Sequence, residues 1–586
     1  MHFVDWGILL AFLLFTIWDG WRKSGNQHSI EDYFLAGRSI PWWAAGISVM
    51  ATQASAITFI GTTGQAYVED MRFLQVYLGI PFAMVILSLT LVPYYRRMRN
   101  FSAYEVLEER FGRATRLTTS FLFLLSRGLA LGFTIAAPSI VLSLLLDVKL
   151  DITILVVGLI ATVYTMAGGI AGVISTDVRQ MGILMFGLLF CFGWIIWSLP
   201  ADVSTGDAIQ VAGALGKLDA IDLSFDLGEK YNVWSGVLAG IFLMLSYFGC
   251  DQTQVQRYLS ARSLREAQGS LMMTAFAKVP MQFIILLLGV MLYVFYVFAP
   301  APLSFRSSEV SVANLPNRAE IEVLRSEHEQ AHEARRVAAL EMLASADGMD
   351  GREEFLRHDA EMVDLRRREK DAMSASIDNY SDTNFIIPWF ILHEIPGGWG
   401  IIGLIIAGIF AAALSSIDST LNSLSTVTIV DWYRRLGNAK RSEAHYVHSS
   451  RVATVLWGVL ATASALLVSR SEGSIIELVN QVGSYFYGSI LGVFILLLWI
   501  RRANGFSALL GLACGMFTVF IGDSIYDNGA GVFLLDLPGF HLGAAGIDWG
   551  ADLPAGFSKS IEYLWLNPLG AGVVVAVGWL FGRRSA

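Results

Sequence analysis

The chain reads Gly46-Ile-Ser-Val-Met-Ala-Thr-Gln-Ala-Ser-Ala-Ile-Thr-Phe-Ile-Gly61 inside a long apolar segment. The centre of this stretch is small and polar, whereas the centre of a lipid-facing helix is usually large and apolar. A second apolar segment ends in a similar way, with Ser246-Tyr-Phe-Gly-Cys-Asp251. Small residues can simply allow helices to pack closely. The two stretches therefore gain meaning from their positions among the other segments of the chain.

The composition is that of a membrane protein. Of the 586 residues, 54% are hydrophobic and 16% are charged, whereas soluble proteins carry about 25% charged residues. Several apolar runs exceed the ~20 residues that span a bilayer. This excludes a soluble enzyme, a disordered chain and a fibrous protein. The net charge of −9 argues against nucleic acid as a partner, and three cysteines, all in apolar runs, predict no disulfide framework.

Thirteen apolar segments emerge when charged residues are taken as borders. Lipid tolerates only helices and closed barrels, and the alternating pattern of a barrel is absent. We therefore predict an all-α polytopic membrane protein with thirteen transmembrane helices. The first segment has no basic leader or cleavage site, which predicts a retained span. The segments lie at about residues 3–18, 40–67, 73–95, 117–146, 152–176, 180–200, 231–250, 269–303, 398–430, 452–469, 478–500, 503–522 and 563–582.

Lysine and arginine are distributed unequally between alternate loops. One set of loops, with the C-terminal tail, holds 22 of these residues, and the short loops of the other set hold 6. The positive-inside rule places the richer set in the cytoplasm. We expect a multi-pass protein of the cell (inner) membrane, with its N-terminus outside and its C-terminus in the cytoplasm. Two cations, Arg127 and Lys278, fall in no loop.

The two unusual stretches lie in the second and seventh segments, which are five apart. Two units of five spans run through a membrane in opposite directions, and interrupted helices at matching positions are typical of inverted repeats with a binding site near the midplane. This predicts two repeats, 40–230 and 231–502, after an extra helix and loop at 1–39. Two further helices follow in 503–586, around an external loop at 523–562.

A charged insert, 306–383, interrupts the second repeat. It holds 11 basic and 18 acidic residues and so carries −7 of the net −9. Its middle is rich in Glu, Arg, Ala and Leu, which favours helix, and Gly348 and Gly351 interrupt this pattern. We predict a helical hairpin that forms an extracytoplasmic cap. The acidic balance of the chain therefore says nothing about what the membrane core binds.

The ninth segment reads Ile406-Ala-Gly-Ile-Phe-Ala-Ala-Ala-Leu-Ser-Ser-Ile-Asp-Ser-Thr-Leu-Asn-Ser-Leu-Ser425. Ser415, Asp418, Ser419 and Asn422 follow the spacing i, i+3, i+4, i+7 and therefore share one helix face. A carboxylate among hydroxyls inside a membrane helix is costly and usually functional. Such oxygens are what a hard cation prefers. A polar packing seam is the simpler alternative.

Seven motifs resemble those of one transporter family. They are Asp32-Tyr-Phe-Leu-Ala-Gly-Arg38, Trp42-Trp43, Ala51 to Gly61, Tyr104 to Phe111, Gly168 to Gln180, Asp251 to Gln268 and Phe410 to Tyr433. Together they resemble the sodium/solute symporter family over roughly residues 28–502, apart from the insert. The resemblance implies a LeuT-type 5+5 inverted repeat with an extra N-terminal helix. It also implies a symporter and not an enzyme.

The resemblance implies a sodium site formed by carbonyls of the broken first core helix and hydroxyls of the eighth. The matching positions are Ala51, Ala54, Ala412, Ser415 and Ser416. Some family members hold a second sodium ion, and the positions that match this site are Asp177, Asp418 and Ser419. Asp418 stands where a hydroxyl is usual, which would strengthen cation binding or let a proton share the site. Na⁺ is the only metal or cofactor that the resemblance implies.

The implied solute site differs from that of the sugar-transporting members. Their amides and glutamate are replaced here by Gln53, Tyr77, Met244 and Asn480. Lys278 alone keeps its type, and Tyr247 matches their aromatic inner gate. The motif Gln254-Val-Gln-Arg-Tyr258 is closer to the iodide, monocarboxylate and vitamin branch, whose substrates are anions. The candidate solute-binding residues are Gln53, Thr58, Tyr77, Arg127, Lys278 and Asn480.

Arg127 bears on the charge of the solute. It lies about 11 residues into the fourth segment, roughly 16 Å deep at 1.5 Å per residue. One interpretation is a bidentate partner for a substrate carboxylate. The alternatives are snorkelling to the membrane interface or pairing with an acid of the protein. Lys278 could likewise bond the carbonyls of an unwound helix.

The insert contains a rival motif, His328-Glu-Gln-Ala-His332, which fits the zinc-protease pattern H-E-x-x-H. A protease needs a third ligand and a dry cleft, and this insert is too charged and too small to build one. A sodium/sugar symporter, a proton-coupled carrier and a sodium-gated channel on the same fold also fit the pattern of spans. The favoured prediction is a monomeric symporter in the lipid bilayer that uses sodium to import a small anionic or zwitterionic solute.

Overall fold

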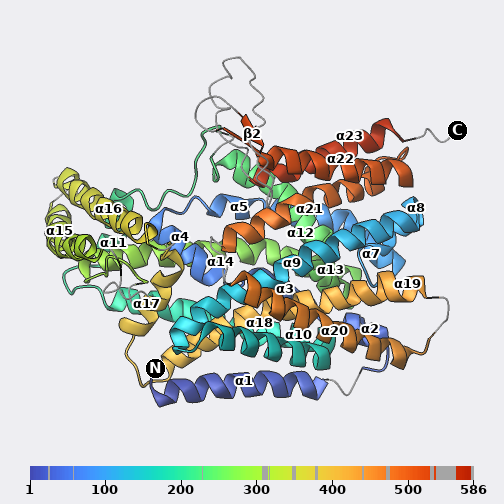
Figure 1. The fold of residues 1–586 in the computed structure, drawn as a ribbon, viewed down its shortest axis with the longest axis horizontal. Coiled ribbons are helices and arrows are strands. Elements are labelled where there is room, and N and C mark those ends of the chain that lie inside the picture. Colours follow the sequence, from blue (N-terminus) through green and yellow to red (C-terminus); the bar gives the residue numbers. More distant parts are fainter. Residues whose placement is uncertain are drawn as a thin grey trace.

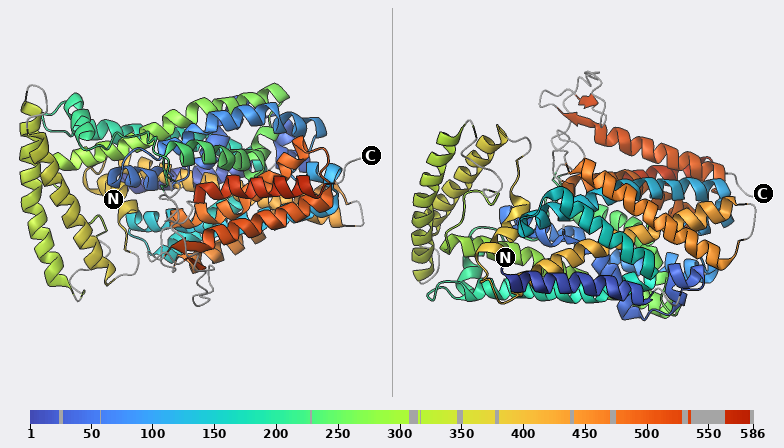
Figure 2. Two further views of the ribbon diagram at one scale, coloured as in Figure 1. Left: turned by 90° about the horizontal axis from the view of Figure 1, so that it is seen from above. Right: turned by 60° about the horizontal axis from the view of Figure 1, so that its bottom comes forward.

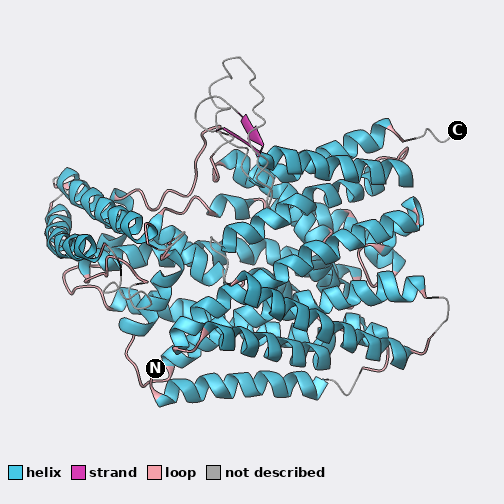
Figure 3. Ribbon diagram, viewed as in Figure 1, coloured by secondary structure: helices cyan, strands magenta, loops and turns pink. Residues whose placement is uncertain are grey.

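The computed structural model is a bundle of helices that run mostly along its longest axis (Figure 1). It is helical almost throughout (Figure 3), and its described strands are one short antiparallel pair, β1 (Ile525–Asp527) and β2 (Phe533–Leu535). The residues that the structure describes are 1–23, 27–56, 58–226, 229–306, 315, 317–345, 351–376, 380–437, 441–469, 475–527, 533–535 and 563–582.

The helices follow one another with short connections. In the first half they are α1 (Phe3–Lys23), α2 (Ile30–Leu35), α3 (Trp42–Gln53), α4 (Thr63–Val68), α5 (Leu74–Leu78), α6 (Ile80–Leu89), α7 (Leu91–Met98), α8 (Glu105–Phe111), α9 (Arg113–Leu146), α10 (Leu150–Trp197), α11 (Thr205–Ala214), α12 (Gly240–Gly249), α13 (Gln252–Leu259) and α14 (Leu264–Phe298). In the second half they are α15 (Arg318–Ala344), α16 (Arg352–Ser374), α17 (Ile386–His393), α18 (Ile401–Val427), α19 (Arg434–Leu436), α20 (Glu443–Val468), α21 (Ile475–Trp499), α22 (Gly505–Ser524) and α23 (Leu566–Leu580).

Seven helices in the described part of the chain are long and apolar enough to cross a membrane. The number rises to nine if each of two bent helix pairs is one span, and two shorter apolar helices lie at Gly483–Trp499 and Gly505–Ile521. Each of the thirteen predicted segments falls on one of the helices, so the sequence located the apolar helices correctly. The number of crossings remains a prediction.

The border between the fifth and sixth predicted segments is wrong. Both segments belong to α10, whose 48 residues would form a rod of roughly 72 Å, more than twice the ~30 Å of a bilayer core. The helix breaks at Gly169, where φ is 54° and ψ is −160°, and not at the charged residues near Asp177. A Cβ atom at Gly169 would lie 2.7 Å from the carbonyl oxygen of Tyr33 in α2, so only glycine fits here.

The first predicted interruption is confirmed. Residues Trp42–Gln53 and Thr58–Val68 form a pair of helices bent by 63°, with a π-helical turn at the start of the second. The hydroxyl of Thr58 donates to the carbonyl oxygen of Gln53 (3.1 Å), and the backbone N–H of Thr58 donates to Ser55 Oγ (3.3 Å). These hydroxyls satisfy backbone groups that the break leaves without helical partners, which lipid cannot do.

The second predicted interruption is confirmed as well, with a bend of 59° between Trp234–Gly249 and Gln252–Leu259. Three buried tyrosine hydroxyls donate to the carbonyl oxygens just before or at the break. The pairs are Tyr95 with Gly249 (2.7 Å), Tyr104 with Cys250 (3.0 Å) and Tyr258 with Phe248 (3.2 Å). Asp251 begins the next helix by accepting from the N–H of Thr253 (2.8 Å). The break is therefore hydrogen-bonded on all sides.

The predicted hairpin is also present, as α15 and α16 with Gly351 in the left-handed conformation (φ 81°) before α16. Figure 2 shows the hairpin lying across one end of the bundle. The helix α1 begins at this end, whereas α8 and α19 lie at the opposite end, where α23 also ends (Figure 1). The N-terminal helix thus starts on the hairpin side of the bundle.

Candidate ion and solute site

The helix α18 lies at the centre of the candidate site. All of its residues from Ile405 to Val427 are buried, and its polar face looks toward the break after α3. The hydroxyl of Ser416 donates to the carbonyl oxygens of Thr52 (3.2 Å) and Ala412 (3.4 Å). The structure therefore brings Ser416 and Ala412 to the end of α3, next to Ala51 and Ala54.

Ser415 belongs to a neighbouring cluster around Asp177. Its hydroxyl donates to Asp177 Oδ1 (2.5 Å), and the hydroxyl of Ser48 donates to Asp177 Oδ2. The guanidinium of Arg257 lies 3.5 Å from the same carboxylate. Ser415 therefore turns away from the end of α3, toward the acid on α10.

Asp418 extends this cluster by one turn of α18. It accepts hydrogen bonds from the hydroxyls of Tyr164 and Ser419. Arg257 also contacts Ser419, so one guanidinium faces two carboxylates, and all three charged side chains are fully buried. A buried charge is expensive unless it is paired. The cluster carries one excess negative charge, and it therefore favours a bound cation or a proton.

Three members of this cluster were not among the predicted site residues: Ser48, Tyr164 and Arg257. The sequence placed Arg257 in a motif but read it as a loop cation, because charges served as borders of spans. A signal was available, since Gln254, Gln256 and Arg257 lie on a short segment directly after an interrupted helix. Tyr164 and Ser48 had no such signal, because each lies in an ordinary helical pattern.

Arg127 pairs with an acid of the protein. Its Nε donates to Asp251 Oδ2 (2.5 Å), and its guanidinium lies 5.3 Å and 5.4 Å from the ring centroids of Tyr247 and Tyr487. The hydroxyl of Tyr247, the predicted gate, accepts from the amide of Gln254 (2.8 Å). Arg127 does not snorkel, because its partner lies at the break between α12 and α13, in the interior of the bundle.

Lys278 is fully buried on α14, and its ammonium has no hydrogen-bond partner among the described residues. It lies 5.5 Å from the ring centroid of Tyr77. The alternative that Lys278 bonds carbonyls of an unwound helix is therefore not what the structure shows. Such an ammonium, next to an aromatic face, is suited to receive an anionic or hydroxyl oxygen from a ligand.

The remaining predicted solute residues lie at or near the same break. The amide nitrogen of Gln53 is 3.8 Å from Met244 Sδ, and its amide oxygen has no partner in the described part of the chain. Thr58 uses its hydroxyl on the backbone of Gln53. Asn480 falls within α21, and its side chain lies outside the described residues.

The zinc-protease motif has a structural role in the hairpin. His332 Nε2 lies 2.9 Å from the carbonyl oxygen of Ala299 and 3.3 Å from that of Tyr296, at the end of α14. Burial lowers the pKa of His328 to about 4. No group of three His, Cys, Asp or Glu side chains that could hold a metal occurs in the described ranges. The protease alternative is not favoured.

Comparisons with known proteins agree with this geometry. The model of the Sodium:solute symporter family matches residues 33–322 and 374–515. The Sodium/sialic acid symporter SiaT of Proteus mirabilis is 26% identical over 529 residues, with 88% of this chain and 89% of that protein covered. The Sodium-dependent multivitamin transporter of Oryctolagus cuniculus is 25% identical over 607 residues, with 99% and 81% covered.

A solved structure shows the same fold. It is the substrate-bound outward-open state of a Na⁺-coupled sialic acid symporter, with a TM-score of 0.72 and 23% identity, covering 99% of this chain and 97% of that one. The fold and the buried ion cluster define a multi-pass membrane transporter. The chain belongs to the sodium:solute symporter family, and it is a sodium-coupled symporter of a small organic solute.

Proposed function

We propose that the solute is an anion or a zwitterion that carries a carboxylate. The observation that supports this most directly is the environment of Arg127, a guanidinium held inside the bundle by a single carboxylate, Asp251. Lys278 supplies a second buried cation, without a partner in the described residues. Two relatives whose names specify sialic acid, an acidic sugar, and one named for vitamins agree with this class of substrate.

The solute carboxylate would replace Asp251 as the partner of Arg127. Both groups present two oxygens, so the exchange conserves the bidentate geometry that a guanidinium prefers. The exchange would also release Asp251 from Arg127 at the break before α13. Binding of the solute would thereby alter the second broken helix, next to the ring of Tyr247, which we propose as the gate.

The first sodium ion would bind between α18 and the end of α3. Carbonyls of Ala51, Ala54 and Ala412 and the hydroxyl of Ser416 are its proposed ligands. The orientation of Ser416 supports this assignment, because its hydroxyl reaches the backbone of α3 at Thr52. Ser415 would join the site only by rotating away from Asp177.

A second cation would bind at Asp177, Asp418 and Ser419. The excess negative charge of this cluster supports the proposal, and either Na⁺ or a proton would neutralise it. The stoichiometry therefore depends on which of the two the cluster selects. A sugar-transporting or purely proton-coupled symporter is the second candidate, which only the titratable Asp418 favours.

The proposed topology has thirteen spans, with α10 forming two of them on either side of Gly169. Residues 40–230 and 231–502 would form the two inverted repeats, after the extra helix in 1–39. Arginines of α7, α8 and α19 gather at the end opposite the hairpin, which supports a cytoplasmic location for that end. The N-terminus and the hairpin would then lie outside a cell (inner) membrane, and the monomer would be sufficient for transport.

The driving force is adequate for uphill uptake. Each sodium ion that moves inward gains ~2.3 kcal/mol per 100 mV of membrane potential, and two ions would double this. Because Gln53 and the proposed sodium ligands lie on the same broken helix, ion binding would order the backbone that contacts the solute. Such coupling between two sites must be reciprocal.

A thermal-shift screen of the purified protein tests the proposal. Small carboxylates, amino acids, sugar acids and neutral sugars are compared in sodium and in choline buffer, since ligand binding stabilises a protein by mass action. We expect stabilisation by a carboxylate in sodium and none in choline. Stabilisation by neutral sugars alone would contradict the anionic assignment, and equal stabilisation in choline would contradict sodium coupling.

A further inference from the structure

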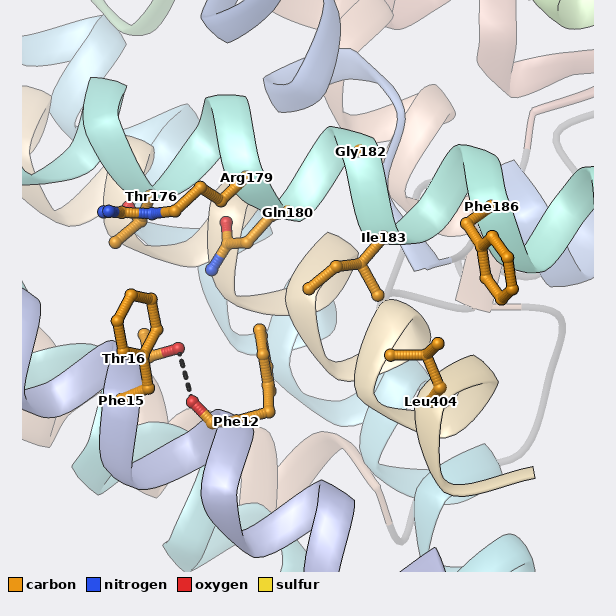
Figure 4. A pocket seen from close by; sticks show the side chains of 10 residues that line it. All are labelled: Phe12, Phe15, Thr16, Thr176, Arg179, Gln180, Gly182, Ile183, Phe186 and Leu404. Atoms are coloured by element: carbon orange, nitrogen blue, oxygen red, sulfur yellow. Dashed lines mark hydrogen bonds between the residues drawn. The ribbon is translucent and has the colours of Figure 1, made fainter. Parts of the chain in front are cut away.

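A cavity of about 400 Å³ lies between the N-terminal helix and the core. Phe12, Phe15 and Thr16 of α1 line one side, and residues of α10 and α18 line the other (Figure 4). None of the proposed ion or solute residues borders it. Its volume is within the ~300–1,000 Å³ of small-molecule sites, so the cavity is large enough for a ligand of its own.

The cavity results from how α1 is attached. Near its start, Asp5 Oδ1 accepts from the N–H of Gly403 (3.3 Å), and a Cβ at Gly403 would lie only 2.2 Å from the Asp5 carbonyl oxygen. Near its end, Asp19 forms an ion pair with Arg179 of α10. The helix is thus fixed to the core at both ends, and the space between the two attachments stays open.

The walls of the cavity are mainly apolar, and its rim faces the lipid. Phe15 and Phe186 at the rim are exposed, and Ile183 and Leu404 line the interior. Water has few partners in such a place, whereas a hydrocarbon chain fills it without loss. In a bilayer, the hydrocarbon that can enter sideways between two helices is the acyl chain of a lipid.

One polar group in the cavity has no use inside the protein. Thr16 donates to the carbonyl of Phe12 (2.9 Å), Thr176 donates to its own helix, and Arg179 is bound to Asp19. Gln180 is only 2% exposed, and neither atom of its amide has a hydrogen-bond partner in the described part of the chain. The Tyr164 hydroxyl lies near this amide, but its hydrogen goes to Asp418.

Figure 4 shows the Gln180 amide reaching from α10 toward α1, above Phe12. A buried amide without a partner costs free energy, which an ester carbonyl or hydroxyl of a ligand would recover. Arg22 lies about six residues beyond Thr16, roughly 9 Å along α1, and its side chain is 61% exposed. A cation at this distance is placed to meet the phosphate of a lipid headgroup.

We propose that this cavity binds one phospholipid, with an acyl chain between α1 and α10, its ester carbonyl on Gln180 and its phosphate near Arg22. The lipid would complete the packing of the N-terminal helix against the core. This inference does not rest on the identity of the solute.

Two glycines of α10 provide a matched test. A Cβ atom added at Gly182, which lines the cavity, or at Gly193, which lies on the same helix away from it, meets no heavy atom within 4 Å. Gly182→Phe should therefore fill the cavity without a clash, and Gly193→Phe adds the same side chain elsewhere. Phospholipid retained by the full-length protein after purification in mild detergent is counted by native mass spectrometry.

We expect the wild type and Gly193→Phe to retain one more phospholipid per chain than Gly182→Phe. Gln180→Leu keeps the apolar space but removes the amide, and should retain the lipid severalfold less well than the wild type. This second variant serves if Gly182→Phe does not fold. Equal lipid counts in all four proteins would overturn the proposal. A retained neutral amphiphile in place of a phospholipid would overturn the assignment of the occupant.

Discussion

At the scale of single residues, the central observation is that charges inside the bundle meet charges from distant parts of the chain. Arg127 meets Asp251, and Arg257 meets Asp177. These pairs differ in their balance. The first is neutral, whereas the second leaves Asp418 in excess. The neutral pair can exchange a carboxylate with a solute, and the unbalanced cluster can take up a cation.

The exchange predicts that Asp251→Asn strengthens the binding of a carboxylate solute. The variant removes the competing charge but keeps the shape and the cap of α13, so we expect roughly tenfold tighter binding, equal to ~1.4 kcal/mol. Arg127→Gln should abolish carboxylate binding. Isothermal titration calorimetry in sodium buffer measures both effects.

The double variant with both changes tests the folding of the single variants, because it restores a neutral pair. Asp207→Asn, at an exposed helix cap far from the site, is the control for the loss of one acid. If Asp251→Asn weakened carboxylate binding while the protein stayed folded, the exchange would be excluded.

The sodium site predicts that Ser416→Ala raises the sodium concentration needed for half-maximal stabilisation severalfold. The hydroxyl lost is the one that reaches α3, and one polar contact is typically worth about 1 kcal/mol. Solute affinity should also depend less on sodium, because the two sites are coupled. Ser423→Ala is the control, since Ser423 donates within its own helix (Ser419 carbonyl, 3.0 Å). A sodium midpoint unchanged by Ser416→Ala would refute the assignment.

At the scale of elements, the hairpin α15–α16 is attached to the core by polar contacts. Arg335 bonds the Tyr296 carbonyl (2.7 Å) and Asp359, which in turn accepts from Tyr293 (2.8 Å). His332 bonds two more carbonyls of the same helix end. The hairpin therefore covers the end of α14 through side chains that must keep their charge states.

His328 predicts the response of the hairpin to acid. Burial, with a contribution from Arg335 and Arg366, lowers its pKa from 6.5 to about 4. Between these values the unfolded hairpin binds a proton that the folded one does not, so stability falls as the pH drops from about 6.5 toward 4. Limited proteolysis between α15 and α16 measures the effect as a function of pH.

His328→Phe should remove much of this pH dependence, because phenylalanine occupies the buried position without a proton to gain. His358→Gln, on the outer face of α16, should leave it unchanged. Proteolysis of the wild type that does not change across this pH range would argue against the buried histidine as its cause.

At the scale of the whole molecule, the sequence predicted the apolar helices, both interruptions and the hairpin. Each of these has a local signal, namely small residues in an apolar run or glycines in a charged helix. The border at Gly169 was missed for a physical reason. Arg179 and Asp177 look like loop residues, but Asp19 and Arg257 pair with them, and such pairs between distant helices leave no local pattern. For the same reason Tyr164 and Ser48 could not be predicted.

The hairpin also shapes the electrical environment of one end of the molecule. Its segment carries −7, and the resulting negative potential extends over a Debye length of ~8 Å at physiological ionic strength. It accumulates sodium at the entrance and repels an anionic solute. Added choline chloride at fixed sodium should therefore raise the apparent Michaelis constant for sodium and lower that for the solute. Glu320→Gln with Glu329→Gln should reduce both responses, and shifts of equal sign would contradict this effect. Screening alone would then determine how this transporter divides its affinity between its two cargoes in dilute and in saline surroundings.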